Sequence, residues 1–318
     1  MRFVEAAGVR MSAIGLGTWQ FGSREWGYGK EYADHEAAAI VRRALELGVN
    51  VIDTAEVYAL GRSERIVAAA IEDVGRDEVF LATKVFPLFA FGAVMAARAR
   101  ASLRRLGVDA ADLYQIHFPN PAIPFGLQAA GLARVLDDGL AHHVGVSNYS
   151  LAGWRKVEDV LGRPVLSNQV QFSMVRRRPA EVMVPYAASS DRVVIAYSPL
   201  AQGFLSARYG PDNLPGGGVR RSNSLFSKDN LTRAADLYDA LRDVASSHDA
   251  EPAQVALAWL IHHPHVVAIP GASSVEQVEF NAAAADIVLG DDEFAHLTKV
   301  AEEFTPASRG PLGRLVRT

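Results

Sequence analysis

The sequence predicts an α/β fold, a (β/α)8 barrel of the TIM type that spans residues 1–318 as one domain. Eight short apolar runs recur along the chain, and amphipathic helical segments separate them, which is the pattern of βαβ units around a parallel sheet. Most runs lack polar alternation, as expected of strands buried on both faces. No run leads into G-x-G-x-x-G with an acidic residue about twenty positions on, so a dinucleotide-binding open sheet is disfavoured.

A hairpin is expected at the start of the chain, with strands at 2–5 and 9–12 around a turn through Gly8. The eight apolar runs expected to form the barrel lie at 13–17, 49–53, 79–83, 112–117, 143–147, 166–170, 193–197 and 266–270.

The helices between these strands have recognisable ends. Asp34 and Ser63 are each expected to N-cap a helix, and Ser150 to cap a third that buries Val160. Pro252 suits the first turn of a later helix. A segment rich in Gly, Pro, Ser and Arg at 203–230 breaks the rhythm after the seventh run, where a long loop would lie on the catalytic face of a barrel.

Composition excludes several classes of protein. The chain is 49% hydrophobic and 21% charged with a net charge of −4, so it offers neither a basic footprint for nucleic acid nor a polybasic membrane patch. It has no cysteine, which excludes disulfides and thiolate zinc sites. Without a signal peptide or a long apolar stretch, a cytoplasmic protein is expected.

Four polar side chains follow three consecutive strands. Asp53 ends the second strand and Tyr58 follows it, Lys84 follows the third, and His117 ends the fourth. Strand ends of a barrel meet at its active face, so these groups are expected to lie together. Each alone has an ordinary structural explanation, but their joint occurrence at successive strand ends favours a catalytic site.

The four groups suit proton transfer to a carbonyl oxygen. A tyrosine has an unperturbed pKa of about 10, and a neighbouring Lys84 is expected to lower the pKa of Tyr58. Asp53 would keep the lysine charged, and His117 would orient the carbonyl. Such a tuned acid facing a carbonyl is what hydride transfer requires.

Motifs along nearly the whole chain resemble those of the aldo-keto reductase family. They are GLGTW at 15–19, DTAEVY at 53–58, GRSE at 61–64, Lys84, DLYQIH at 112–117, GVSN at 145–148, NQ at 168–169, AYSPL at 196–200 and IPGA at 269–272.

The resemblance implies a barrel closed at its bottom by the N-terminal hairpin, and Asp53, Tyr58, Lys84 and His117 as its catalytic tetrad. It also implies NADP(H) as the cofactor, with the loop after strand seven covering it. The cofactor contacts that it implies are Gly17, Thr18, Trp19, Ser147, Asn148, Gln169, Tyr197, Ser198, Pro199, Leu200, Gly203, Leu205, Arg208, Gly271, Ser273, Gln277 and Asn281.

The phosphate end departs from the family pattern. Ser274 and Gln277 suggest a capping box at a helix start that could attract phosphate. Ser273 and Gln277 are neutral where NADPH-specific relatives carry Lys or Arg. The loop could supply the missing charge through Arg208, Arg220, Arg221 or Lys228. The resemblance implies NADP(H), because the family uses it most often, and NAD(H) is not excluded.

Four aromatic residues, Trp19, Trp26, Phe86 and Phe118, suggest an apolar substrate pocket, although Trp19 and Phe86 could equally pack at the rim. The histidines at 142–143 and 262–265 lack an accompanying carboxylate motif, so no metal site is expected. The arginine run at 176–178 is expected to be a solvated loop.

The function predicted is NAD(P)H-dependent reduction of aldehydes or ketones, with Tyr58 as proton donor. A small-molecule carbonyl is the expected partner, with no nucleic acid, membrane or obligatory protein partner. Two alternatives stay open: a Schiff-base lyase that uses Lys84, and a redox-sensing regulatory subunit.

Overall fold

Eight parallel strands form a barrel, as predicted. The computed structural model describes residues 1–29, 32–88, 91–216 and 218–307. The barrel strands are β3 (Leu16–Gly17), β4 (Val51–Asp53), β5 (Phe80–Val85), β6 (Ala111–Ile116), β7 (Ala141–Ser147), β8 (Ser167–Gln171), β9 (Val193–Tyr197) and β10 (Val266–Ile269). They pair in chain order, and parallel bridges from Ile14 to Ala268 and from Gly17 to Gly271 bring the first and last together.

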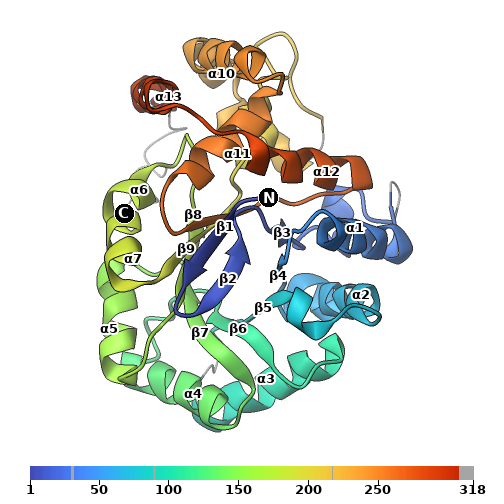
Figure 1. Cartoon of the computed structure of the whole chain (residues 1–318), viewed down its shortest axis with the longest axis vertical. Helices are drawn as coiled ribbons and strands as arrows, with labels where there is room; N and C mark the ends of the chain where they lie inside the picture. The colour runs from blue at the N-terminus through green and yellow to red at the C-terminus, as the bar shows by residue number, and fades with distance from the viewer. Residues whose placement is uncertain (30–31, 89–90, 217, 308–318) are drawn as a thin grey trace.

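The hairpin β1 (Phe3–Ala6) and β2 (Val9–Ser12) lies across one end of the barrel (Figure 1). Ser12 ties it to the start of β4: its amide donates to Asn50 Oδ1 at 2.7 Å, and its hydroxyl accepts from the Asn50 amide at 3.0 Å. The hairpin therefore closes the end of the barrel where the strands begin, opposite the ends that carry the predicted site.

A ring of helices surrounds the strands (Figure 1). The helices of the described residues are α1 (Asp34–Glu46), α2 (Arg62–Ile71), α3 (Gly92–Leu106), α4 (Phe125–Asp137), α5 (Leu151–Leu161), α6 (Arg178–Val182), α7 (Val184–Ser190), α8 (Gly218–Ser222), α9 (Lys228–Arg233), α10 (Ala235–Ser247), α11 (Pro252–His262), α12 (Val275–Ala283) and α13 (Asp291–Glu303). Short 3-10 turns lie at Arg24–Trp26, Tyr58–Gly61, Arg76–Glu78, Ala201–Ser206, Ser224–Phe226 and Ala284–Asp286.

One predicted helix cap is confirmed and two are wrong. The Ser150 hydroxyl accepts from the Gly153 amide at 3.1 Å and caps α5. Asp34 is instead the first residue of α1, after the N-cap Ala33. Ser63 lies inside α2, where its buried hydroxyl contacts the Thr18 hydroxyl at 2.7 Å. Both side chains hydrogen-bond to partners distant in sequence, which local capping patterns do not reveal.

Three further expectations met different outcomes. Pro252 begins α11, as predicted. Val160 on α5 is 43% exposed rather than buried, so the apolar stripe of that helix is narrower than expected. The 203–230 segment is no continuous loop, because α8 and the 3-10 turn at Ser224–Phe226 lie within it and α9 begins at Lys228.

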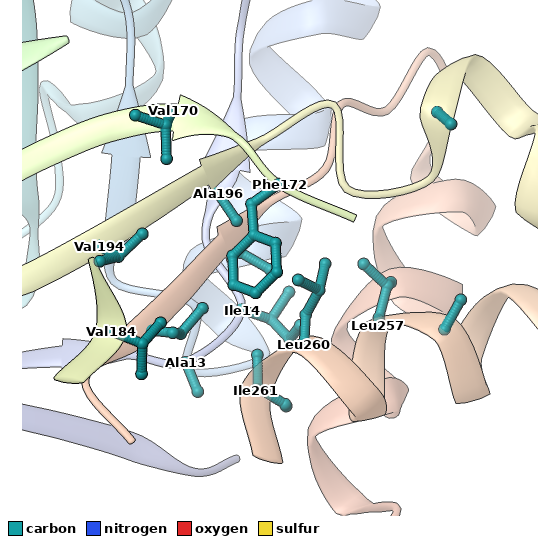
Figure 2. Packing of buried hydrophobic residues seen from close by; sticks show 14 of the residues in the cluster. Ala13, Ile14, Val170, Phe172, Val184, Val194, Ala196, Leu257, Leu260 and Ile261 are labelled. Atoms are coloured by element: carbon teal, nitrogen blue, oxygen red, sulfur yellow. The ribbon is translucent and has the colours of Figure 1, made fainter. Parts of the chain in front are cut away.

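The main apolar core lies between the barrel and its outer helices. Helix α11 is buried all round from Val255 to Leu260. In Figure 2, Leu257 and Leu260 lie beside Phe172, which follows β8. Apolar side chains such as Leu260 stabilise the fold by about 1.5–3 kcal/mol each when fully buried. This packing fixes the strands that carry the polar site.

A buried ion pair joins α2 to α3 behind β5. Glu64 is fully buried and accepts from Arg105 Nε at 2.6 Å and from the Thr83 hydroxyl at 2.8 Å. Its carboxylate is thus paired and hydrogen-bonded, the condition under which a buried charge is tolerated.

Substituting Arg105→Met should destabilise the fold by about 3–5 kcal/mol, because it strands the buried Glu64 carboxylate. Urea unfolding followed by circular dichroism measures the change. Arg163→Met is the matched control, since its pair with Asp137 is about half exposed on both sides and should contribute little. Equal effects of the two substitutions would contradict the role given to Glu64.

Candidate active site

The ammonium group of Lys84 is the centre of the site. It comes from β5 and is fully buried. Its Nζ donates to Asp53 Oδ2 at 2.6 Å, to the Thr54 carbonyl at 2.8 Å and to the Tyr58 hydroxyl at 3.2 Å. All three acceptors come from the end of β4 and the loop after it, so pairing of β4 with β5 builds the arrangement.

Asp53 is held by partners across the barrel interior. Its other oxygen, Oδ1, accepts from Gln169 Nε2 on β8 at 2.7 Å and from Gln115 Nε2 on β6 at 3.5 Å. The Ser167 hydroxyl donates to Gln115 Oε1 at 3.3 Å. A connected polar layer therefore orients the carboxylate that pairs with Lys84.

The pKa values of the buried pair favour a neutral phenol beside a charged ammonium. Burial by itself lowers the pKa of Lys84, but Asp53 and Tyr58 together raise it above its usual value. Burial raises the pKa of Tyr58, and the opposing attraction of Lys84 does not cancel it. The expectation of a lowered pKa for Tyr58 is therefore wrong, because burial outweighs the neighbouring cation.

His117 completes the group. Its ring lies edge-on to Tyr58, with centroids 5.6 Å apart, and stacks on Phe118 at 4.7 Å with an interplanar angle of 8°. Burial, followed by the charge of Lys84, lowers the pKa of His117 to about 3. The imidazole is therefore neutral near pH 7.

A cavity of about 1020 Å³ opens above these groups. The predicted site residues that line it are Gly17, Trp19, Asp53, Tyr58, Phe86, His117, Phe118, Ser147, Asn148, Gln169, Tyr197, Ser198, Pro199, Leu200, Gly203, Arg208, Gly271, Ser273, Gln277 and Asn281. Residues that are far apart in the sequence, from Gly17 to Asn281, therefore line the same cavity.

Some predicted residues lie elsewhere. Leu205 is fully buried in the apolar core, and Thr18 is fully buried with its hydroxyl donating to the Asp53 carbonyl at 3.0 Å. Neither side chain reaches the cavity wall. Lys84 lies beneath the wall, in contact with Tyr58 and Asp53. The side chain of Trp26 lies outside the described part of the structure.

Apolar side chains line the cavity near Tyr58. Trp19 is 48% exposed, and Phe86 and Phe118 are each 40% exposed. Val57, one residue before Tyr58, is a further apolar wall residue that the sequence interpretation missed. This part of the cavity suits an apolar ligand.

Amides and hydroxyls continue the cavity wall beyond the tetrad. The Tyr197 hydroxyl donates to Asn148 Oδ1 at 2.9 Å, and Asn148 Nδ2 donates to the Ser147 hydroxyl at 2.9 Å. The Ser147 hydroxyl in turn donates to the Gln169 carbonyl at 2.9 Å. These contacts fix the Tyr197 ring at the end of β9 and the Asn148 amide that follows β7.

The segment after β9 has an unusual backbone. Ser198, Ala201, Gln202 and Gly203 have φ values of 50°, 48°, 62° and 92°. Non-glycine residues in this left-handed region are uncommon and cluster at functional sites. Successive amides in such conformations form concavities that bind anions.

The far end of the cavity meets the start of α12. The Ser274 hydroxyl accepts from the Gln277 amide at 3.3 Å and caps this helix. A capping box would also have the Gln277 side chain accept from the Ser274 amide, and this part of the prediction is wrong. Gln277 Oε1 accepts instead from the Ser273 amide at 2.9 Å and from the Ser273 hydroxyl at 3.1 Å. The short Ser273 side chain and the adjacent backbone compete for Gln277.

Two wall residues, Gln20 and Glu276, were not singled out from the sequence, whereas Arg220 was one of the loop cations considered. Gln20 donates to the Ala272 carbonyl at 2.6 Å and links the loop after β3 to the loop after β10. Arg220 reaches the cavity from α8, and Glu276 from α12. Of the four loop cations considered, Arg208 and Arg220 line the cavity; Arg221 and Lys228 are not among its lining residues.

Within the described ranges, no group of three or more His, Cys, Asp or Glu side chains is placed to hold a metal ion. In the same part of the chain, no helix is both long and apolar enough to cross a bilayer.

Comparison with known proteins assigns the barrel to a class of oxidoreductases. Uncharacterised oxidoreductases of Mycobacterium tuberculosis are 55% identical over 98% of this chain and 96% of their own length. The methylglyoxal reductase YeaE of Escherichia coli is 32% identical over 95% of this chain and 94% of its own. The structure of an aldo-keto reductase from Klebsiella pneumoniae in complex with NADPH covers 97% of this chain and 98% of its own, with a TM-score of 0.75 at 30% identity.

The sequence model of the aldo/keto reductase family matches residues 13–302. The chain belongs to this family, as its motifs indicated, and it is an oxidoreductase.

The His117 ring should remain neutral from pH 5 to pH 9, because its pKa is about 3. Since this value lies below the unfolded value of about 6.5, its contribution to stability is present above pH 6.5 and is lost as the pH falls toward 3. Imidazole NMR shifts, assigned by their loss in His117→Gln, measure the titration. A titration midpoint near 6.5 would show that burial does not lower the pKa of His117.

Proposed function

We propose that this protein reduces aldehydes or ketones to alcohols with NADP(H), and that Tyr58 donates the proton. The observation that carries the proposal is the contact of Lys84 Nζ with both Asp53 and the Tyr58 hydroxyl at the floor of the cavity. A reduced nicotinamide, when bound, supplies a hydride to the carbonyl carbon.

Two side chains face the cavity as possible acids, and their pKa values separate their roles. His117, with a pKa of about 3, carries a proton in only roughly one molecule in ten thousand at pH 7. Tyr58 has a raised pKa and is protonated. Tyr58 is therefore the donor, and neutral His117 hydrogen-bonds and orients the carbonyl oxygen.

Lys84 makes the phenol a competent acid despite its raised pKa. Its ammonium donates to the phenol oxygen, so the phenol's own hydrogen is left for the carbonyl. As that proton leaves, the same contact becomes an ion pair between the ammonium and the phenolate, which is stronger because both partners are then charged. Asp53 balances the lysine charge throughout.

The cavity fits a dinucleotide in chemistry. Ser147, Asn148 and Gln169 present an amide and hydroxyl cluster for a carboxamide, and the Tyr197 ring offers a stacking face. The segment from Ser198 to Gly203 lines the cavity, and those of its amides that make no internal hydrogen bond are available to a pyrophosphate.

The choice of NADP(H) over NAD(H) rests on two observations. The Klebsiella pneumoniae structure holds NADPH, and here Arg208 and Arg220 line the cavity. Ser273 and Gln277 are uncharged and Glu276 is acidic, so the loop arginines supply the positive charge for a 2′-phosphate.

The apolar wall of Trp19, Phe86 and Phe118 suits a neutral aromatic or aliphatic carbonyl. The lyase alternative is disfavoured, because a Schiff-base lysine must be accessible and deprotonated. Lys84 is fully buried with three acceptors and a raised pKa. Steady turnover of the purified chain separates an enzyme from a redox-sensing subunit, which would hold its cofactor with very slow turnover.

Substituting Tyr58→Phe should reduce aldehyde turnover by at least about 100-fold, the lower range for general acid catalysis. Cofactor affinity should stay within twofold, because the substitution removes one hydroxyl at the cavity floor. Steady-state oxidation of NADPH at 340 nm measures the first, and quenching of tryptophan fluorescence the second. Near-normal turnover in this variant would overturn the assignment.

NADPH should bind more tightly than NADH in the same fluorescence titration. Replacing both Arg208 and Arg220 with Met should weaken NADPH binding about tenfold, or about 1.4 kcal/mol, and leave NADH binding unchanged. Arg221→Met is the matched control, since Arg221 adjoins Arg220 but is not among the cavity-lining residues. A preference of the wild type for NADH would contradict this role of the arginines and would indicate that the uncharged Ser273 and Gln277 determine the cofactor preference.

A further inference from the structure

The ion pair of Glu56 with Arg98 is a structural link that the proposed mechanism does not use. Glu56 lies two residues before Tyr58, and Arg98 lies on α3. Arg98 Nε donates to Glu56 Oε2 at 3.2 Å, and Nη2 contacts Oε1, so the pair is bidentate. The side chain of Arg98 is 26% exposed and that of Glu56 is 11% exposed. The pair is therefore largely shielded from the solvent that weakens surface ion pairs.

Glu56 connects the Tyr58 loop to the end of β5. Its carboxylate oxygen Oε1 accepts from the Phe86 amide at 2.7 Å. Its own amide donates to the Lys84 carbonyl at 3.3 Å. Phe86 follows Lys84 by two residues, so Glu56 contacts the chain on both sides of Val85.

Arg98 also contacts the loop after β5, two residues beyond Phe86. Its Nη1 donates to the Leu88 carbonyl at 2.6 Å. One guanidinium therefore fixes Leu88 and, through Glu56, the backbone at Phe86. Bidentate pairs of this kind add geometric specificity as well as energy.

These contacts determine where the apolar wall lies relative to the proton donor. Phe86 and Val57 both line the cavity beside Tyr58, and both adjoin a backbone that Glu56 holds. The pair itself lines no part of the cavity, so it touches neither substrate nor cofactor. It can act only by positioning the wall.

We infer that Glu56 and Arg98 are positioning residues that set the selectivity of this site for bulky aromatic carbonyls over small aliphatic ones. The inference rests on the proposed reductase function. A bulky substrate uses the Phe86 wall for binding, whereas a small one needs only Tyr58 and His117. Loosening the wall therefore affects the first substrate more than the second.

The test compares kcat/KM for 2-naphthaldehyde and propanal with NADPH. Losing apolar contact equivalent to about two buried methylene groups weakens binding roughly tenfold, so Glu56→Gln or Arg98→Met should lower the naphthaldehyde-to-propanal ratio about tenfold. The loss should arise mainly from KM for naphthaldehyde, with kcat for propanal within twofold. Arg98→Lys, which keeps the charge, should retain part of the ratio.

Arg100→Met is the matched control on the same helix. Arg100 pairs with Asp138 at 2.7 Å on the outer surface, so its loss should leave the ratio unchanged. The double variant Glu56→Gln/Arg98→Met should be no worse than the more affected single variant, because the two residues act as one unit. Thermal unfolding and NADPH affinity are measured on every variant.

The outcomes are distinguishable. A wild-type protein that reduces neither aldehyde refutes the proposed function itself. An active wild type with an unchanged ratio in folded Glu56→Gln and Arg98→Met overturns the inference. An equal loss for both aldehydes also overturns it, because that result indicates a general structural role. Glu56→Gln keeps an acceptor for the Phe86 amide, and Arg98→Met keeps the aliphatic stem, so either variant suffices if the other fails to fold.

Discussion

Burying an ammonium group at the centre of a barrel costs several kcal/mol unless the charge is paired and its hydrogen bonds are satisfied. Lys84 meets this condition with three acceptors, all supplied by the end of β4 and the loop that follows it. The requirement constrains the rest of the site. Asp53 must be charged and oriented, and the Tyr58 hydroxyl must lie within reach of the ammonium.

The barrel supplies this environment in layers. Toward the hairpin, the interior is apolar, with Met11, Val51 and Leu113 among its buried members. Above it, Gln115 and Gln169 form a polar layer around Asp53. Each polar group in such a layer must lie within hydrogen-bond distance of its partner, because an unsatisfied buried group would cost about 1–3 kcal/mol. This network therefore holds the Asp53 carboxylate in one orientation relative to Lys84.

The order of strands and the meeting of the four polar residues could be predicted from the sequence, because both follow from local patterns and from barrel topology. The direction of the pKa shift of Tyr58 could not be predicted in this way. Its direction depends on how far burial exceeds the attraction of Lys84, and burial is a property of the packed cavity. The roles of Asp34 and Ser63 were also missed, since their partners Arg62 and Thr18 are distant in the chain or in another element.

By itself, the sequence determined the barrel, the family and the residues at each strand end, since apolar periodicity and short motifs encode them locally. Only the tertiary structure decided which of these residues share a cavity and which charge states they hold. In the structure, Thr18 and Leu205 do not line the cavity, whereas Gln20 and Glu276, which were not predicted, do. It also joined Glu56 to Arg98 across forty-two positions. The physical reason is that burial, desolvation and long-range pairing depend on distances that sequence spacing does not specify.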